Sequence, residues 1–263
     1  MDISTINQNF YDLCKEFNLG DPNILRRFVH GLDTANCCFS LASSKYFDEK
    51  DRVFIYTVGL LHDIGRMIQW KKYANFSDTK TRPHELLGVE YLEKNWIKRF
   101  FKTKTEQNLA LKLIAHHTEP YTGKDEKMNK FMPILRDSDC YSNLQYTSTG
   151  LQRLWLNADG VTPAVLAKFR LRQNLHGTII HTKLDRILQF LSRTYVIEHN
   201  ILKRDLLARK YINTIYDVYH ANLNQEDDKL LYKECWNLKR DLAQEVTQHD
   251  EIKKLAEEGI KKD

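Results

Sequence analysis

Five histidines in the first half of this 263-residue chain lie on or beside expected helices: His30, His62, His84, His116 and His117. Asp63 directly follows His62, and Asp137 and Asp139 come later in the same half. Neutral imidazole nitrogens and carboxylate oxygens suit Mn, Fe, Co, Ni and Zn, and with more carboxylate or water they suit Mg. Taken alone, His30, His84, Asp137 and Asp139 would more often be structural, and the doublet His62-Asp63 favours function only modestly. Their joint order predicts a divalent metal site.

The doublet His62-Asp63 stands at the end of an apolar run, in the string GLLHDIGR. A carboxylate next to such a helix is costly to bury unless it is paired or bound to metal. Neighbouring residues on a helix point ~100° apart. Both side chains can therefore reach one metal only near the end of the helix, unless Asp63 bridges toward a second metal.

These residues need helices to position them, and the apolar spacing predicts an all-α fold. The first helix is indicated by apolar residues three and four positions apart, namely Leu25, Phe28, Leu32, Ala35, Phe39 and Ala42. Asp21-Pro22 provides an N-cap and a first-turn proline for it. A second helix is expected over 53–61, with Asp51 near its start and Gly65 just past its end.

Three further helices are expected in this half: one opened by Pro83, one around 109–114, and one begun by Pro133. The stretch 141–163 is rich in Ser, Thr, Asn and Gly and is the expected linker. It separates a metal-binding helical core, 1–145, from a helical extension, 146–263, that packs on or beside the core. Within the extension, 177–181 is consistent with a short strand or turn, and the charged tail from residue 248 is expected to fray.

Composition indicates a cytoplasmic globular protein. Five scattered cysteines without a CxxC pair do not make a disulfide scaffold. No apolar run approaches the ~20 residues of a membrane span, and the N-terminus, with Asp2, does not resemble a signal peptide. The net charge is +5, but the basic residues are interspersed with 35 acidic ones. This mixture disfavours a nucleic-acid partner.

The order H…HD…H…HH…D resembles the HD-domain superfamily of metal-dependent phosphohydrolases. The four defining positions are matched by His30, His62, Asp63 and Asp137, and GLLHDIGR resembles the central motif. The segments HELLGVEYL, LIAHHTEP and LRDSDCYSNL resemble those that add further ligands in two-metal members. The resemblance covers about residues 20–145. Because no GYP follows HHTE, the chain resembles an uncharacterised bacterial branch and not the cyclic-di-GMP phosphodiesterases.

The resemblance implies one or two divalent ions, of Mn, Fe, Ni, Co, Zn or Mg. The first ion would be held by His30, His62, Asp63 and Asp137, with Asp139 as the second choice for the last ligand. The second would lie ~3.5–4 Å away, held by bridging Asp63, His84 and either His116 or His117.

Cationic residues near these ligands are candidates for contacts with the substrate. Arg66 is expected to contact a phosphate, because its guanidinium forms bidentate bonds; the alternative is a plain cation at a helix end. Lys80 and Arg82 are further phosphate candidates, although a solvated loop is the favoured explanation for them. No comparable sequence pattern surrounds four later histidines, which are interpreted as structural: His176, His181, His199 and His220.

The expected activity is hydrolysis of a phosphate ester, either a nucleotide or another small phosphorylated molecule, by a metal-activated water. Asp63 and Arg66 would be the catalytic residues. Two alternatives share the same ligands: a di-iron oxygenase of the HD type, and a regulatory HD module without turnover. The sequence leaves the substrate, the metal and a homo-oligomeric state open.

Overall fold

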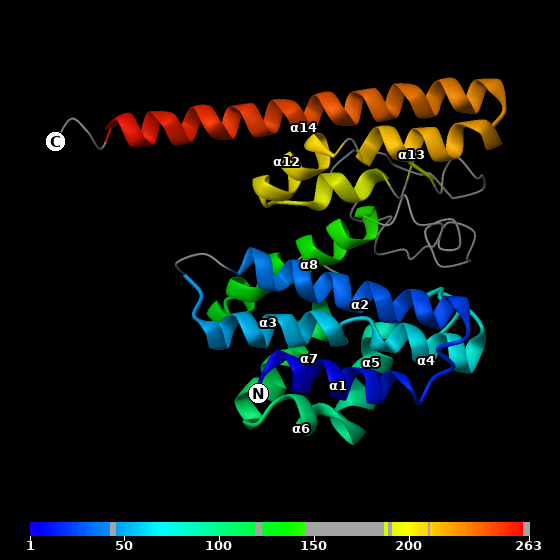
Figure 1. Ribbon diagram of the computed structural model, residues 1–263, viewed down its shortest axis with the longest axis vertical. Helices are drawn as coiled ribbons and strands as arrows, with labels where there is room; N and C mark the ends of the chain where they lie inside the picture. Colours follow the sequence, from blue (N-terminus) through cyan, green and yellow to red (C-terminus); the bar gives the residue numbers. More distant parts are fainter. Residues whose placement is uncertain (43–45, 119–122, 146–186, 189–190, 210, 260–263) are drawn as a thin grey trace. The chain divides into compact units, whose positions relative to one another are not determined.

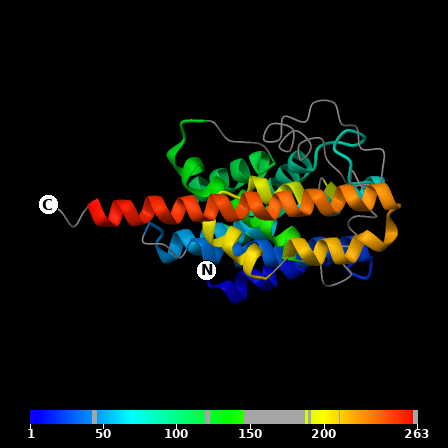
Figure 2. The same cartoon turned by 90° about the horizontal axis from the view of Figure 1, so that it is seen from above.

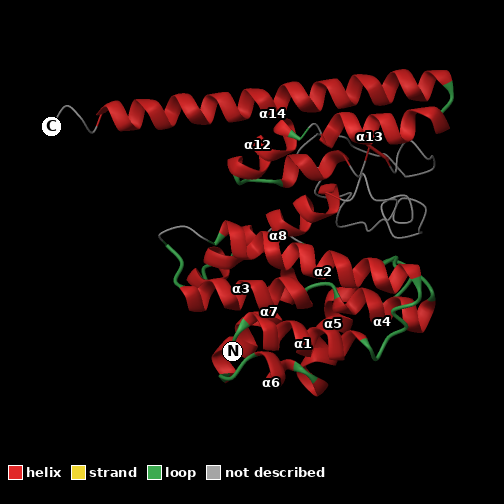
Figure 3. Ribbon diagram, viewed as in Figure 1, coloured by secondary structure: helices red, strands yellow, loops and turns green. Residues whose placement is uncertain are grey.

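The computed structural model describes residues 1–42, 46–118, 123–145, 187–188, 191–209 and 211–259. The described residues form helices joined by loops, with no strand among them (Figure 3). The predicted all-α class is confirmed. The chain divides into two compact units, Met1–Leu175 and His176–Asp263, which are described separately. The boundary between the units lies outside the described residues. So do the stretch 177–181 and two of the histidines interpreted as structural, His176 and His181.

The first unit contains the expected metal-site residues. Its helices are α1 (Ile3–Cys14), α2 (Pro22–Leu41), α3 (Glu49–Leu61), α4 (Ile64–Tyr73), α5 (His84–Asn95), α6 (Ile97–Phe100), α7 (Lys104–His116) and α8 (Glu126–Gln145). The expected start of α2 is confirmed, because the Asp21 side chain accepts a hydrogen bond from the Asn23 backbone N–H and Pro22 occupies the first turn. Helix α7 begins with a capping box formed by Thr103 and Glu106.

The chain changes direction at the His62-Asp63 doublet. Helix α3 ends there, and α4 begins at Ile64, so Gly65 belongs to a new helix and not to the end of the previous one. Asp63 has φ −105° and ψ 13°, in the bridge region outside the α-helical range. The helix break removes the ~100° constraint between neighbouring side chains, so His62 and Asp63 can both face the same site.

Two expected boundaries are wrong around α8. Pro133 lies inside this helix and does not begin it. The helix begins earlier because the Asp125 carboxylate accepts hydrogen bonds from the backbone N–H groups of Lys127 and Met128. At the other end, α8 continues to Gln145, so the first five residues of the expected linker are helical. The rest of that linker lies outside the described residues.

Small residues let the helices around the site approach closely. A Cβ added to Gly59 of α3 would lie 2.9 Å from the Cα of Ala35 in α2, which runs beside it (Figures 1 and 2). A Cβ added to Gly65 of α4 would lie 1.8 Å from the carbonyl oxygen of His84 in α5. These contacts bring the starts of α4 and α5 together. His84 is thereby held beside Asp63 although 20 residues separate them in the sequence.

The second unit is built on one long helix. Its described elements are η2 (Ser192–Val196), α12 (Asn200–Ala208), α13 (Tyr211–Tyr219), η3 (His220–Asn222) and α14 (Gln225–Gly259). Helices α12 and α13 pack along α14 (Figure 1), and an ion pair between Lys203 and Glu245 joins α12 to it. The tail expected to fray is helical as far as Gly259. No helix in the described part of the chain has the length and hydropathy needed to span a membrane.

Gly65→Ala tests whether the contact between α4 and α5 positions the site. The new methyl group would overlap the backbone of His84, which cannot move aside as a side chain can. We expect a loss of about 3 kcal/mol or more in the free energy of unfolding, at the upper end for overpacking, measured by urea denaturation. Gly20→Ala is the control, since its Cβ would meet only the Asn18 side chain. An equal effect of both substitutions would contradict this role of Gly65.

Candidate metal centre

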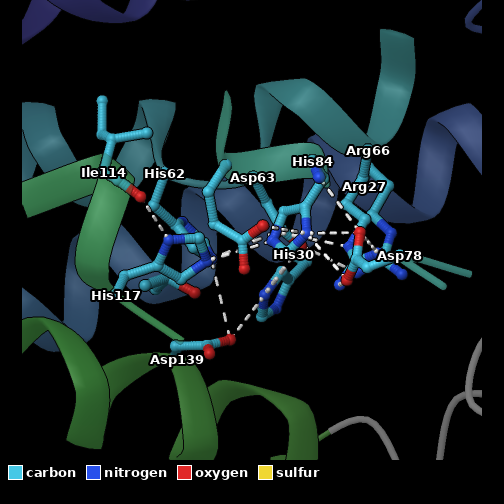
Figure 4. A network of polar contacts seen from close by, with 12 residues as sticks. Arg27, His30, His62, Asp63, Arg66, Asp78, His84, Ile114, His117 and Asp139 are labelled. Carbon is cyan, nitrogen blue, oxygen red and sulfur yellow. Dashed lines mark hydrogen bonds and ion pairs between the residues drawn. The ribbon is translucent and has the colours of Figure 1, made fainter. Parts of the chain in front are cut away.

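Asp63 lies at the centre of a buried network that draws on five segments of the first unit (Figure 4). The chain positions the histidines and carboxylates around it at helix ends or facing inward from helices. They are His30 from α2, His62 and Asp63 from the α3–α4 junction, His84 from the start of α5, His117 at the end of α7, and Asp139 from α8. The four imidazoles are all buried.

Asp63 belongs to two groups of residues whose ligand atoms lie within 4.8 Å of one another: His30 with His62, and His84 with His117. The Oδ2 atom of Asp63 lies 3.8 Å from His30 Nε2. Its Oδ1 atom lies 3.3 Å from His84 Nε2 and 3.8 Å from His117 Nε2. The two carboxylate oxygens thus face different groups. This arrangement suits a carboxylate shared between two metal positions.

The Nδ1 atoms of three histidines are held by acceptors outside the centre. His62 Nδ1 donates to the Gly59 carbonyl and His117 Nδ1 to the Ile114 carbonyl, each at 2.7 Å. His84 Nδ1 donates to the Asp78 carboxylate at 3.0 Å. Because these acceptors require the hydrogen on Nδ1, the neutral ring has its lone pair on Nε2. Metal-binding histidines are oriented in this way by partners behind them.

The Nε2 atoms of the same three rings face one another or the carboxylates of the centre. His84 Nε2 and His117 Nε2 lie 3.4 Å apart, so their lone pairs face each other. His62 Nε2 is buried and has no hydrogen-bond partner among the described residues. Unsatisfied buried polar atoms are costly. A cation bound by these nitrogens would relieve the close approach of His84 Nε2 to His117 Nε2 and would also give His62 Nε2 a partner. The donor set therefore fits a divalent metal.

The protonation states also suit a metal. Burial would raise the pKa of Asp63, but the Arg27 guanidinium, whose Nη1 donates to Asp63 Oδ2 at 2.8 Å, holds that pKa well below its usual range. Asp63 and Asp139 in turn raise the pKa of His62 against the effect of burial, so metal binding there would displace a proton. Burial lowers the pKa of His30 and of His117. The carboxylate is therefore ionised and these imidazoles are neutral near pH 7, which are the forms that bind metal.

Asp139 is the α8 carboxylate that contacts the histidines. Its Oδ1 atom lies 3.0 Å from His30 Nε2 and 3.6 Å from His62 Nε2. Asn143, one turn later, donates to the same oxygen at 3.0 Å. Asp137 is also buried, but two residues on a helix project ~200° apart. The geometry therefore favours the second choice, Asp139, over the expected Asp137.

The structure also distinguishes between the two adjacent histidines, His116 and His117, as candidate ligands. His117 is buried within the second group, whereas His116 is exposed. His116 ends α7, and His117 follows as its C-cap. Only His117 therefore joins the candidate ligands, which leaves His116 outside the expected set.

Of the three expected phosphate contacts, only Arg66 lies at the centre, where its Nε is 3.9 Å from Asp63 Oδ1. Arg66 is buried, and its Nη1 donates to the Asp78 carboxylate at 3.0 Å and to the Phe76 carbonyl at 2.6 Å. It therefore holds Asp78, which in turn orients His84. Arg82 is exposed and ion-paired with Glu90, and Lys80 is exposed as well. The geometry supports a positioning role for Arg66 and gives no support to substrate contacts by the other two.

The sequence reasoning missed Arg27 and Asp78. Arg27 stands one helical turn before His30, and this spacing alone placed it on the same face of α2. Asp78 lies in the loop between α4 and α5, where no periodicity indicated its direction. Burial would raise its pKa, but His84 and Arg66 lower it below the usual range. Asp78 is therefore an ionised partner behind the candidate metal ligand.

Comparison with protein families identifies the domain that contains these candidate ligands. The HD domain family matches residues 27–147. Residues 27–147 form an HD domain. The match includes every residue of the two groups around Asp63 as well as Asp139. No curated protein and no solved structure matches the chain, so the bacterial branch stays a prediction.

His117→Ala and His116→Ala form a matched pair of substitutions. Removal of His117 should weaken metal binding by at least the ~10–100-fold that follows loss of an outer partner, because a candidate ligand is lost. Removal of exposed His116 should leave binding unchanged. Metal titration followed by elemental analysis measures both. Weaker binding in the His116 variant alone would reverse the assignment.

Asp139→Asn and Asp137→Asn separate the two carboxylates of α8 with little change in shape. We expect the first substitution to reduce metal affinity by about tenfold or more, again by comparison with the effect of outer partners, and the second to change it less. Affinity is read from metal titration, and circular dichroism reports whether each variant folds. A folded Asp137 variant that loses metal while the Asp139 variant retains it would restore the original expectation.

Proposed function

We propose that this HD-domain protein is a metal-dependent phosphohydrolase that cleaves a phosphate ester, either a nucleotide or another small phosphorylated molecule. The observation that carries the proposal is Asp63, a buried carboxylate with its two oxygens directed toward two separate histidine groups. Phosphoryl transfer commonly uses such a paired site.

The ligands divide into two sets. One ion would be held by His30, His62, Asp63 and Asp139, and a second by Asp63, His84 and His117. Divalent metals there would stabilise charge on the phosphoryl oxygens and lower the pKa of a water molecule toward ~7. The same nitrogen and oxygen donors also suit iron, so the metal identity is part of the test.

The surrounding residues prepare these ligands for binding. Arg27 keeps Asp63 ionised, and the Arg66–Asp78 pair fixes the ring of His84 through its Nδ1 atom. Ser142 lies 3.1 Å from His30 Nδ1 and holds that ring in the same way. Loss of such outer partners typically costs 10–100-fold in metal affinity or activity.

Solvent reaches the ligands mainly from the side of Asp139. Its side chain is 18% exposed, against 9% for Asp63 and 0% for His62. A phosphate ester would therefore approach past α8, while the ring of His62 stays shielded from water. We therefore propose that the reacting phosphoryl group binds near Asp139 and Asp63.

The decisive experiment assays the purified protein with Mn²⁺, Co²⁺, Ni²⁺ and Mg²⁺ against a panel of nucleotides and phosphomonoesters. We expect metal-dependent release of phosphate or of a nucleoside monophosphate. Asp63→Asn should lower the rate by about 10²-fold or more, because metal stabilisation of the transition state amounts to several kcal/mol.

Asp12→Asn is the control for this experiment, because Asp12 is paired with Lys15 on the surface of α1. Bound metal without turnover of any substrate in the panel would contradict the proposal. Iron in the purified protein together with oxygen uptake would instead identify the oxygenase reaction.

A further inference from the structure

Arg26 of α2 is a buried arginine without a partner among the described residues. Its residue is 5% exposed, and the Nε, Nη1 and Nη2 atoms are all buried without a hydrogen bond. The other two buried arginines nearby differ, since Arg27 is bonded to Asp63 and Arg66 to Asp78. A buried guanidinium left unpaired is among the costliest arrangements in a protein interior. It therefore needs an explanation.

Arg26 lies next to the candidate metal centre. It stands one helical turn before His30 on the same face of α2. Its guanidinium carbon is 5.2 Å from the centroid of the Phe76 ring, and that of Arg27 is 4.9 Å from the same centroid. Arg27 in turn contacts Asp63. Arg26 is thus one side chain removed from the carboxylate shared by the two histidine groups.

Positive charge is in excess at this place. Burial lowers the pKa of Arg26 well below its usual value, and the nearby charges of Arg27 and Arg66 lower it further. Asp63 is the carboxylate that opposes this effect, and it is already bonded to Arg27. An additional anion would compensate the unneutralised charge of Arg26.

Stacking on Phe76 does not by itself account for the burial of Arg26. Arg52 of α3 provides the comparison, because its guanidinium carbon lies 3.9 Å from the centroid of Phe39. Arg52 also forms an ion pair with Glu49 at 3.1 Å, and its side chain is 27% exposed. Beside its contact with the ring, Arg52 thus retains both water and a carboxylate. Arg26 has no described carboxylate partner and little water.

We propose that Arg26 binds a second phosphoryl group of the substrate, separate from the one that is hydrolysed at the metal centre. This inference rests on the proposed phosphohydrolase function and narrows its substrates to compounds with at least two phosphoryl groups. The guanidinium offers five N–H donors in a planar fork that matches phosphate oxygens. A terminal phosphoryl group has three oxygens and up to two charges, so it uses these donors more fully than a carboxylate does.

The test compares two non-hydrolysable probes, methylenediphosphonate with two phosphonate groups and methylphosphonate with one. Their affinities for the full chain are measured by calorimetry, both as purified and after treatment with EDTA. We expect the wild-type protein to prefer methylenediphosphonate, and Arg26→Met to reduce this preference by about 10–100-fold, the loss expected for charged hydrogen bonds. Arg52→Met is the matched control and should retain the preference.

Thermal unfolding of the same variants excludes a structural effect. Because Arg26→Met removes an unpaired buried cation, we expect its melting temperature without ligand to equal or exceed that of the wild type. An unchanged preference for methylenediphosphonate in this variant would overturn the inference, even if the enzyme hydrolyses phosphate esters. If Arg26→Met does not fold, Arg26→Lys replaces it, since lysine keeps the charge but loses the planar fork.

Two further outcomes distinguish a phosphoryl site at Arg26 from a general dianion site and from the proposed phosphohydrolase function. An equal dependence on Arg26 for malonate and methylenediphosphonate would identify a general dianion site and contradict the choice of phosphoryl groups. Absence of turnover in the substrate panel, with the preference for methylenediphosphonate still lost in Arg26→Met, would contradict the proposed function while leaving the anion site in place.

Discussion

The site depends on one ion pair, the contact between Asp63 and Arg27. A buried carboxylate tends to take up a proton, and a protonated Asp63 would lose the ability to share its two oxygens between two cations. The guanidinium of Arg27 prevents this at a distance of 2.8 Å. The break between α3 and α4 then determines where the carboxylate points. The helix break at Asp63 and the ion pair with Arg27 together allow a buried carboxylate to face two groups of candidate ligands.

Two buried polar groups near that carboxylate, His62 Nε2 and the guanidinium of Arg26, have no hydrogen-bond partner among the described residues. The Nε2 atoms of His84 and His117 face each other beside them. By contrast, the outward nitrogens of the same histidines are bonded to carbonyls, a carboxylate or a hydroxyl. Folding alone favours satisfaction of every buried polar atom. The contrast between the two sides of the His62 ring therefore fits a site that could hold a metal ion.

The helices around the site pack so closely that a side chain larger than hydrogen does not fit at their contact. Gly65 and Gly88 allow α4 and α5 to touch backbone to backbone, which brings His84 into reach of Asp63. The loop between these helices carries Asp78, and Arg66 secures it from α4. The arginine expected to bind substrate thus stabilises a loop that orients a ligand. A cation near a metal site can act through its neighbours as well as through the substrate.

The sequence by itself determined the all-α class, the HD pattern and the identity of most candidate ligands, because helical periodicity and ligand chemistry are local properties. It also indicated a bridging role for Asp63. Only the tertiary structure selected Asp139 and His117. These choices depend on which face of α8 turns inward and on which of the two neighbouring histidines at the C-terminal end of α7 is buried. It also revealed Arg26, Arg27 and Asp78, whose roles arise from contacts between distant segments. Burial and pairing are properties of packed helices, and no spacing along the chain specifies them.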